Sequence, residues 1–437
     1  MFVCASHRSL RLSNRALLTL AMTVDGSLSS FATAAFDVAI IGGGVAGCAA
    51  ARSLAATNAG ATKLTITIYE IGRGPGGRAS TRKSRQIPPM RINHGAPCAD
   101  ISTPAGRDAL RDLHLPPFVG RVGGIDSSSG RFTPRPADDS GDPPLYVTGE
   151  NNEMTQLASS LLAGVRPPSA LTTRYSTMVR GLSRNHDDGR WQLHDKSGAT
   201  VGAADWIIVA GSGVAHPRWT STFGGAPPLV AAATTLDDPI LDQALAAIAL
   251  QDASPILAVF FYCTGEAAQQ WIKLGFSVGE FCDKNPVLSK LIVQPTTHDE
   301  NTQGCSVVLH STAAFARTHT GVYGASSSAA RVGDAATDTS REESLIQQML
   351  GALADVPGLP PTGAPSMEYG PLLHRWGNAF PRGAPLSERL TLCAASRVGF
   401  CGDYTDTPAR MGSVEAALLS GLSIGKRVGT LIETKTE

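Results

Sequence analysis

The first apolar segments of the chain alternate between strand-like and helix-like patterns. Residues 38–41 are apolar and mostly β-branched, as in a strand that is buried on both faces. An alanine-rich stretch with helical spacing follows as far as Leu54, and a second apolar run, KLTITIYE, ends at Glu70. A strand, a helix and a second strand in this order predict a parallel sheet covered by helices, which is the basis of an α/β fold.

Later apolar runs predict more strands and a capped helix. PILAVFFYC (255–263) and CSVVLHST (305–312) have the composition of strands in a second sheet. SREESLIQQMLGALADV (340–356) predicts a helix with Ser340 as its N-cap. The prolines that follow, at 357, 360 and 361, predict its end.

Composition and charge exclude several classes of partner. The chain has 437 residues, of which 42% are apolar, and its 37 basic residues balance its 37 acidic ones. A zero net charge does not favour nucleic-acid or anionic-membrane partners, which require a basic excess. We expect no membrane span, because no window approaches the roughly 18 apolar residues that one requires. The eight cysteines form no CxxC or zinc-like cluster, so we expect reduced thiols and no metal site.

The first 35 residues differ in composition from the rest of the chain. They contain Arg8, Arg11 and Arg15, are rich in Ser, Ala and Leu, and have their first acidic residue at Asp25. This composition is typical of an organellar transit peptide. We expect import into a plastid or a mitochondrion, between which the composition does not decide; the alternative is an ordinary tail on a cytoplasmic protein.

A glycine-rich turn follows the first predicted strand. Gly42, Gly44 and Gly47 form a G-x-G-x-x-G pattern, with Val45 and Ala46 between the last two glycines. In such a turn the first glycine permits the tight bend, the second lets the backbone approach a pyrophosphate, and the third lets helix and strand pack closely. The N-terminus of the following helix then faces the anion. We therefore predict a dinucleotide site at these five residues.

Two further features indicate which dinucleotide is bound. Glu70 ends the second strand about 20 residues after the turn, where an acidic side chain accepts hydrogen bonds from the adenosine ribose and disfavours a 2′-phosphate. Gly76, Gly77 and Arg78 then offer backbone N–H groups and a guanidinium to a second anionic surface. Because a nicotinamide-dependent dehydrogenase does not usually need this element, we predict FAD as the cofactor.

In combination, these motifs resemble the FAD-binding amine oxidase superfamily, in which a C-terminal segment returns to the first domain and closes over the flavin. FCGDYTDTPARMGSVEAALLSG (400–421) is similar to that segment. The resemblance implies a helix N-terminus whose free N–H groups stabilise negative charge on the flavin. We expect small residues here because the flavin ring lies against the backbone. The implied cofactor-binding residues are Gly402, Asp403, Gly412, Ser413, Val414 and Ala417.

Several other segments resemble renalase and its bacterial and plant homologues. They are INHGAPCAD (92–100), the segment around Met154, the meander 177–213 and YGPLLHRWGNAFP (369–381). The resemblance implies a strand and a hairpin in the meander, which returns to the FAD domain in a strand at 207–210. The resemblance places His94, Gly95 and Ala96 beside the flavin and Val179 near the adenine. The sequence departs from the family at ENNEM (150–154), where the family more often has a glycine before the methionine.

The resemblance also implies a reaction. Renalase-type enzymes transfer a hydride from aberrant isomers of reduced nicotinamide dinucleotides to flavin, and oxygen then reoxidises the cofactor. This chemistry requires little acid–base help. The candidate substrate-pocket or catalytic residues are His94, Arg375, Trp376 and Asn378.

Two alternatives remain open. The first is oxidation of an amine or an isoprenoid-type substrate, for which the superfamily often uses a lysine near the flavin and an aromatic cage. Lys273 and Lys290 lie in the predicted substrate domain but in no recognisable motif, and Tyr369 and Tyr404 do not make an evident cage. The second alternative, from another class, is an FAD-binding protein without turnover.

These predictions define a two-domain architecture. We expect a discontinuous FAD-binding Rossmann-like domain of the glutathione reductase type, and a second, α+β substrate domain. The FAD domain is assigned to residues 36–105, 146–222 and 388–437, and the substrate domain to 106–145 and 223–387. The flavin is expected between the two, where ligand sites commonly lie.

Overall fold

The computed structural model describes residues 35–57, 63–136, 145–283, 285–297, 303–362 and 367–434. The predicted transit peptide lies outside these ranges except for Ala35. The described residues from Ala35 onward belong to one compact unit. None of the helices in the described ranges is long and apolar enough to cross a membrane.

Six strands form the first sheet, in the order β19-β20-β13-β1-β2-β9. All neighbours are parallel except β19 and β20. The strands are β1 (Ala35–Ile41), β2 (Lys63–Tyr69), β9 (Ala170–Arg174), β13 (Trp206–Ala210), β19 (Leu392–Cys393) and β20 (Val398–Cys401). The predicted α/β class is therefore confirmed, and strands from both ends of the chain share one sheet.

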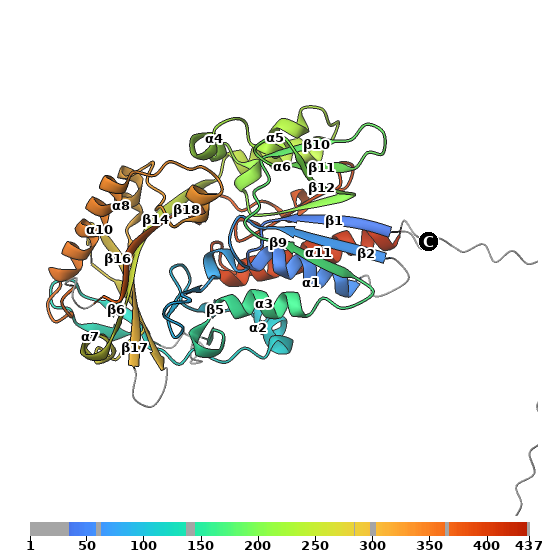
Figure 1. The fold of residues 1–437 in the computed structure, drawn as a ribbon. Coiled ribbons are helices and arrows are strands. Elements are labelled where there is room, and N and C mark those ends of the chain that lie inside the picture. Colours follow the sequence, from blue (N-terminus) through green and yellow to red (C-terminus); the bar gives the residue numbers. More distant parts are fainter. Residues whose placement is uncertain are drawn as a thin grey trace, which may run out of the picture. The chain divides into compact units, whose positions relative to one another are not determined.

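Both faces of the first sheet are covered (Figure 1). Val38 and Ile40 pack on α1 (Val45–Thr57) and α11 (Val414–Glu433), whereas Ala39 and Ile41 point to the opposite face. On that face lies a three-stranded meander of β10 (Gly181–Arg184), β11 (Trp191–His194) and β12 (Thr200–Ala204). Because successive side chains of a strand point to opposite faces, burial of both faces explains the unbroken apolar run of β1.

A second sheet has seven strands in the order β18-β14-β17-β16-β15-β6-β7. The strands are β6 (Val122–Ile125), β7 (Phe132–Pro134), β14 (Asp252–Thr264), β15 (Val278–Phe281), β16 (Leu288–Thr297), β17 (Gln303–Ser311) and β18 (Tyr369–Arg382). One face packs on α7 (Gly265–Ile272), α8 (Ala313–Thr318) and α10 (Thr339–Ala354). The other face packs Phe260 and Tyr262 against Met90 and Ile92.

The remaining elements lie outside these two sheets, the meander and the helices named above. They are η1 (Gly77–Ala79), β3 (Arg82–Lys83), β4 (Arg91–Ile92), β5 (Ala99–Ile101), α2 (Pro104–Leu110), η2 (Arg111–Leu113), β8 (Leu145–Val147), η3 (Glu150–Asn152), α3 (Thr155–Ala163), η4 (Gly213–Ala215), α4 (Arg218–Phe223), α5 (Pro228–Ala233), α6 (Pro239–Ala249), α9 (Ser328–Arg331) and η6 (Glu388–Leu390).

The two sheets correspond to the two predicted domains, but some helices do not follow the predicted boundaries. All strands of the first sheet lie in the segments assigned to the FAD domain, and all strands of the second sheet lie in those assigned to the substrate domain. However, α5 and α6 pack in the core of the first sheet, with Val209 and Trp191, although they follow the predicted boundary at residue 223. The division into two domains stays a prediction.

The predicted N-cap of α10 is wrong by two residues. Asp338 caps this helix, because its side chain accepts a hydrogen bond from the N–H of Arg341 at 3.0 Å. Ser340 lies inside the first turn. Asp and Ser are comparable N-caps, so composition alone did not decide between them.

Two glycines of α11 face α1 and allow the two backbones to touch. A Cβ atom at Gly421 would lie 2.1 Å from the carbonyl oxygen of Ala46, and one at Gly425 would lie 2.4 Å from that of Ala50. No side chain fits at these distances. Gly421 and Gly425 are therefore required by helix packing, so packing and not the cofactor accounts for the glycine at position 421. The small residues at 412–417 stay predicted to lie at the flavin.

This close packing predicts opposite effects for two Gly→Ala substitutions. Gly421→Ala should destabilise the protein by about 1–3 kcal/mol, because overpacking outweighs the roughly 1 kcal/mol gain in helix propensity. Gly351→Ala is the matched control, since Gly351 is an exposed residue of α10 with open space around its Cβ position. This control should stabilise the protein by about 0.5–1 kcal/mol. Urea unfolding midpoints measure both effects, and a stabilised Gly421→Ala variant would contradict the packing argument.

Candidate functional site

A cavity of about 660 Å³ lies at the carboxyl ends of β1, β13 and β20. In open α/β sheets this edge is where ligands bind. Most of the predicted site residues line it. They are Gly42, Gly44, Val45, Ala46, Glu70, Gly76, Gly77, Arg78, Gly95, Ala96, Trp376, Asn378, Gly402, Asp403, Gly412, Ser413, Val414 and Ala417.

The two glycine-rich turns form one wall of the cavity. Gly44 and Gly76 pair as an isolated parallel bridge, and the N–H of Gly76 donates to the carbonyl oxygen of Gly43 at 2.8 Å. Gly42 has a φ of +111°, which favours glycine. A Cβ atom added at Gly44 would meet nothing within 4 Å, so the backbone there is open to the cavity.

The first residues of two helices, Val45 of α1 and Val414 of α11, also line the cavity. Helix N-termini present unpaired N–H groups and attract negative charge. The cavity therefore has two anion-attracting helix ends and a glycine surface along which a ligand can touch the backbone. This combination fits a dinucleotide pyrophosphate.

Glu70 lies at the end of β2 and is buried. Its carboxylate accepts hydrogen bonds from the N–H groups of Gly43, at 2.7 Å, and Gly72. Burial raises the pKa of this carboxyl, although both backbone hydrogen bonds oppose the rise. A carboxylate has about four acceptor positions, so it can still accept hydrogen bonds from ribose hydroxyls.

Arg78 joins three distant parts of the chain at the cavity. Its guanidinium forms a bidentate ion pair with Asp403, with N···O distances of 2.6 and 2.7 Å. It also donates to the carbonyl oxygen of Ala379 at 2.6 Å. Bidentate pairs fix geometry as well as charge. The pair thus holds the second glycine turn, the C-terminal segment and β18 together.

Three predicted cofactor residues do not line the cavity: Gly47, Val179 and His94, the last of which is described below. A Cβ atom at Gly47 would lie 2.0 Å from the carbonyl oxygen of Gly42, so this glycine permits close packing below the turn. Val179 is buried in the core between the first sheet and the meander. Nearby, the N–H of Thr177 donates to the carbonyl oxygen of Glu70 at 2.9 Å, which places this segment beside Glu70 without exposing Val179 to the cavity.

Of the predicted substrate-pocket residues, Arg375 and His94 are absent from the lining. Arg375 donates to the carbonyl oxygens of Ala316 and His319, at 2.9 and 3.0 Å, which lie at the end of α8. Because side chains alternate along β18, its neighbour Trp376 reaches the cavity while Arg375 does not. The expectation of Arg375 in the substrate pocket is corrected accordingly.

His94 is buried beside the cavity in an aromatic cluster. Its ring lies 4.9 Å from that of His374, 5.2 Å from that of Trp376 and 5.3 Å from that of Phe260, between centroids. The carbonyl oxygen of His94 accepts hydrogen bonds from Trp376 Nε1 and His310 Nε2, both at 3.1 Å. His94 therefore positions two residues that line the cavity, and its own ring does not line it.

Three histidines near the cavity are neutral at pH 7. Burial, together with the positive potential of neighbouring groups, lowers the pKa of His94 well below its usual value. Burial and Lys290 lower the pKa of His310 to about 3. Burial and Arg82 do the same for His374, also to about 3.

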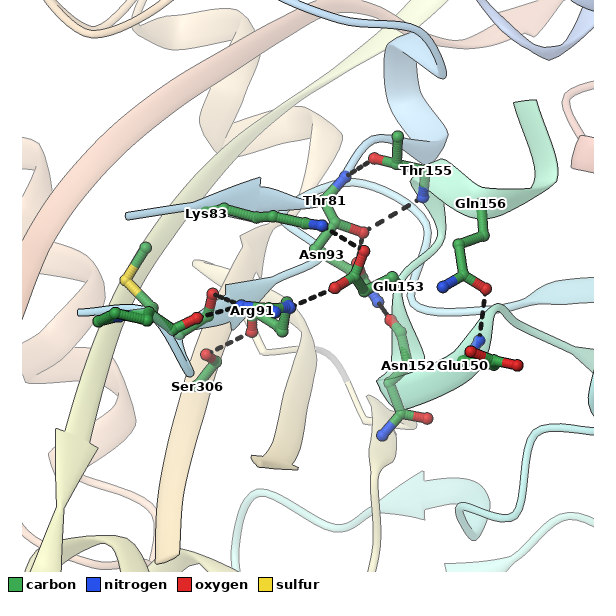
Figure 2. A network of polar contacts seen from close by, with 12 residues as sticks. Thr81, Lys83, Arg91, Asn93, Glu150, Asn152, Glu153, Thr155, Gln156 and Ser306 are labelled. Carbon is green, nitrogen blue, oxygen red and sulfur yellow. Dashed lines mark hydrogen bonds and ion pairs between the residues drawn. The ribbon is translucent and has the colours of Figure 1, made fainter. Parts of the chain in front are cut away.

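Figure 2 shows the polar network that anchors the segment leading to His94. Glu153 forms ion pairs with Lys83, at 2.5 Å, and with Arg91. The side chain of Asn93 donates to the carbonyl oxygen of Asn152 at 2.6 Å, and Asn152 has a φ of +60°. The sequence departure ENNEM therefore supplies a buried carboxylate and a left-handed turn, both of which hold this segment in place.

Sequence reasoning missed two parts of the lining. The first is the turn after β13, residues 210–213, where Ser212 Oγ accepts a hydrogen bond from Asn378 Nδ2 at 3.3 Å. The glycine-rich turn after a predicted strand is the sequence feature that could have indicated that these residues belong to the site. The second part comprises Glu280, Lys290 and His310 of the second sheet, Arg135 directly after β7, and Asp100 of β5. No local pattern in the sequence marks those residues.

The parallel sheet, the glycine-rich turn into α1 and the cavity at the strand ends define a Rossmann-like dinucleotide-binding fold with a second sheet domain. The family described as NAD(P)-binding Rossmann-like domain matches residues 40–113. No curated protein sequence matches the chain.

Two solved structures with a similar fold are amine oxidases. Cyclohexylamine oxidase from Brevibacterium oxydans IH-35A is 14% identical, with a TM-score of 0.54 over 91% of this chain and 99% of that one. A triple mutant of putrescine oxidase is 14% identical, with a TM-score of 0.52 over 92% of this chain and 99% of that one. At this identity the likeness concerns the fold.

Proposed function

We propose that the chain is an FAD-dependent oxidoreductase of the oxidase type. The observation that carries this proposal is that three motifs far apart in sequence line one cavity. They are the turn at Gly42–Gly47, the Gly76-Gly77-Arg78 turn and the C-terminal segment beginning at Gly402. A nicotinamide dinucleotide alone does not account for the second and third motifs. The similar fold of two amine oxidases supports the same class.

Each end of an FAD molecule has suitable partners in this cavity. Glu70 would hold the adenosine ribose, and the N-terminus of α1 with Gly44 would hold the pyrophosphate. The N-terminus of α11, near Gly412 and Ser413, would lie at the flavin ring and favour negative charge there. When bound, the flavin supplies the redox chemistry by accepting a hydride equivalent from the substrate and passing electrons to oxygen.

The protein residues bind, orient and exclude water around the reacting groups. Arg78 and Asp403 fix the junction between the two glycine turns and the C-terminal segment. Trp376, whose indole N–H is bonded to the carbonyl of His94, gives a flat apolar wall on which a substrate ring can pack. Asn378 is held by Ser212 and Arg218 and presents an amide to the same space.

For the substrate, we propose aberrant isomers of reduced nicotinamide dinucleotides. The support is the renalase-like segment 369–381, which contributes Trp376 and Asn378 to the cavity. A hydride leaves carbon in this reaction, so no strong base is required. The buried neutral histidines, whose ordinary basicity is suppressed by burial, are compatible with that requirement.

Amine oxidation is the second candidate, and one observation favours it specifically. Lys290, which lies in no recognisable motif, is brought to the cavity lining by β16, while Lys273 is not. The solved structures of similar fold are oxidases of putrescine and of cyclohexylamine. Tyr369 and Tyr404, considered above for an aromatic cage, do not line the cavity.

One anaerobic experiment separates these candidates. Purified protein reconstituted with FAD should be yellow, and it should be mixed first with aged NADH and NADPH preparations and then with a panel of amines. Bleaching by the aged nucleotides supports the first candidate. Bleaching by amines alone rejects it in favour of the second, and failure to bind FAD rejects the proposed class.

A further inference from the structure

The part of the cavity lined by β15, β16, the residue after β7 and the paired strands β5 and β8 carries a linked group of charged side chains. Lys290 Nζ lies 3.1 Å from Glu280 Oε1, and Arg135 Nη2 lies 3.2 Å from Glu280 Oε2. Arg135 Nη1 also lies 3.9 Å from Asp100 Oδ2, with which it forms an ion pair, and donates a hydrogen bond to the hydroxyl of Tyr146 at 2.8 Å. All five residues line the cavity, and we call them with Arg410 the charged end.

Positive charge exceeds negative charge at the charged end. Arg135, Lys290 and Arg410 are cations, whereas Asp100 and Glu280 are the carboxylates among the described lining residues of this end. Burial would raise the pKa of Glu280, but the three cations together hold it below its usual value. The carboxylate therefore stays ionised, and the group carries one net positive charge.

Lys290 has unused capacity to bind an anion. An ammonium group has three donors, and Glu280 is the acceptor that the described residues provide. Its side chain is 23% exposed, so the remaining donors face a partly dehydrated space in which charge-assisted hydrogen bonds are strong. His310, which shares the cavity with Lys290, is neutral and leaves the net charge of this group unchanged.

We infer that the charged end binds an anionic group of the substrate, a carboxylate or a phosphate, with Lys290 and Arg135 as the specificity-determining residues. This rests on the proposed function, because the charged end shares its cavity with the proposed flavin site. A simple cationic amine is disfavoured there by repulsion. The substrate class is therefore one in which the oxidised carbon and an acidic group belong to the same molecule.

Binding of small probes to the FAD-reconstituted protein tests this inference. Isothermal titration calorimetry at low ionic strength compares benzoate, inorganic pyrophosphate and the benzylammonium ion. At least one of the two anions should bind about tenfold more tightly than benzylammonium. A preference for benzoate indicates a carboxylate-bearing substrate, and a preference for pyrophosphate indicates a phosphate-bearing one.

Two substitutions should move anion affinity in opposite directions. Lys290→Met should weaken anion binding about tenfold, whereas Glu280→Gln should strengthen it, because it removes a competing carboxylate. Lys196→Met is the matched control, since Lys196 is ion-paired with Asp334 at 3.0 Å but does not line this cavity. Its affinity for all probes should equal that of the wild type. Lys290→Arg should retain anion binding.

Tighter binding of benzylammonium, or anion affinities that Lys290→Met leaves unchanged, would overturn the inference. These outcomes are distinguishable from failure of the proposed function, which is shown by an inability to take up FAD. In a protein without FAD, pyrophosphate at the glycine turns would not respond to Lys290→Met, while an anion at the charged end would.

Discussion

A Gly44→Leu variant is expected to fold like the wild type and to purify with less than stoichiometric FAD. A Cβ atom at this position meets nothing within 4 Å, and Gly44 is not among the glycines with positive φ. The protein itself therefore tolerates the side chain. The added atoms would occupy the space beside the first turn of α1 in which we place the pyrophosphate, and affinity should fall by at least about tenfold.

The measurement is the ratio of flavin absorbance to protein after gel filtration, together with the unfolding midpoint. Gly351→Leu is the matched control, because Gly351 is also surrounded by open space but lies on an exposed face of α10. It should bind FAD as the wild type does. Stoichiometric flavin in Gly44→Leu would show that the cofactor does not use this turn.

The second large effect is expected on acidification. Lowering the pH from 7 to 5 should reduce the free energy of unfolding by about 2 kcal/mol for each histidine that stays neutral in the folded protein. His94, His310 and His374 have folded-state pKa values far below the unfolded value, to about 3 for the last two. Burial is the main cause in each case, reinforced by Arg82 or Lys290.

The sign follows from proton binding. Below pH 6.5 the unfolded chain takes up protons on these rings and the folded protein does not, so stability falls as the pH falls toward 3. Carboxyls with lowered folded-state pKa values, such as those of Asp238 and Glu415, lose their contribution only at a lower pH. The raised pKa of Glu70 acts in the opposite direction.

Urea unfolding at pH 7, 6 and 5 measures this dependence. A His374→Gln variant should show a slope that is smaller by about 1.4 kcal/mol per pH unit near pH 5. The control His186→Gln, in an exposed turn, should leave the slope unchanged. Equal stability at pH 7 and pH 5 in the wild type would contradict the argument.

The nucleotide-binding end of the cavity could be predicted because its chemistry is local and mostly backbone. Gly42 and Gly44 act through a turn whose geometry is set within a few residues, and Glu70 ends a strand that a short apolar run identifies. The strand at 207–210 was predicted, yet the turn after it was not assigned to the site. Because the carboxyl ends of parallel strands lie at the same edge of the sheet, the sequence was sufficient to assign this turn to the site.

The faces of β18 could not be predicted in the same way. His374, Arg375 and Trp376 are adjacent, and alternation places Trp376 at the cavity and Arg375 on the opposite side. A shift of one residue in the pairing with β14 would exchange these faces. The pairing of β14 with β18 contains register shifts. Because of these shifts, no local pattern in the sequence indicates which side chains of β18 face the cavity.

The amino-acid sequence by itself determined an α/β fold with a glycine-rich dinucleotide turn, an acidic residue at the end of β2 and a small-residue helix near the carboxyl end of the chain. Only the tertiary structure decided that the glycines of that helix serve packing against α1, and that Arg135, Glu280 and Lys290 meet in one cavity. Turns and strand ends follow from short-range geometry. A charged cluster built from β15, β16 and the segment after β7 depends on long-range strand pairing, which sequence spacing does not encode.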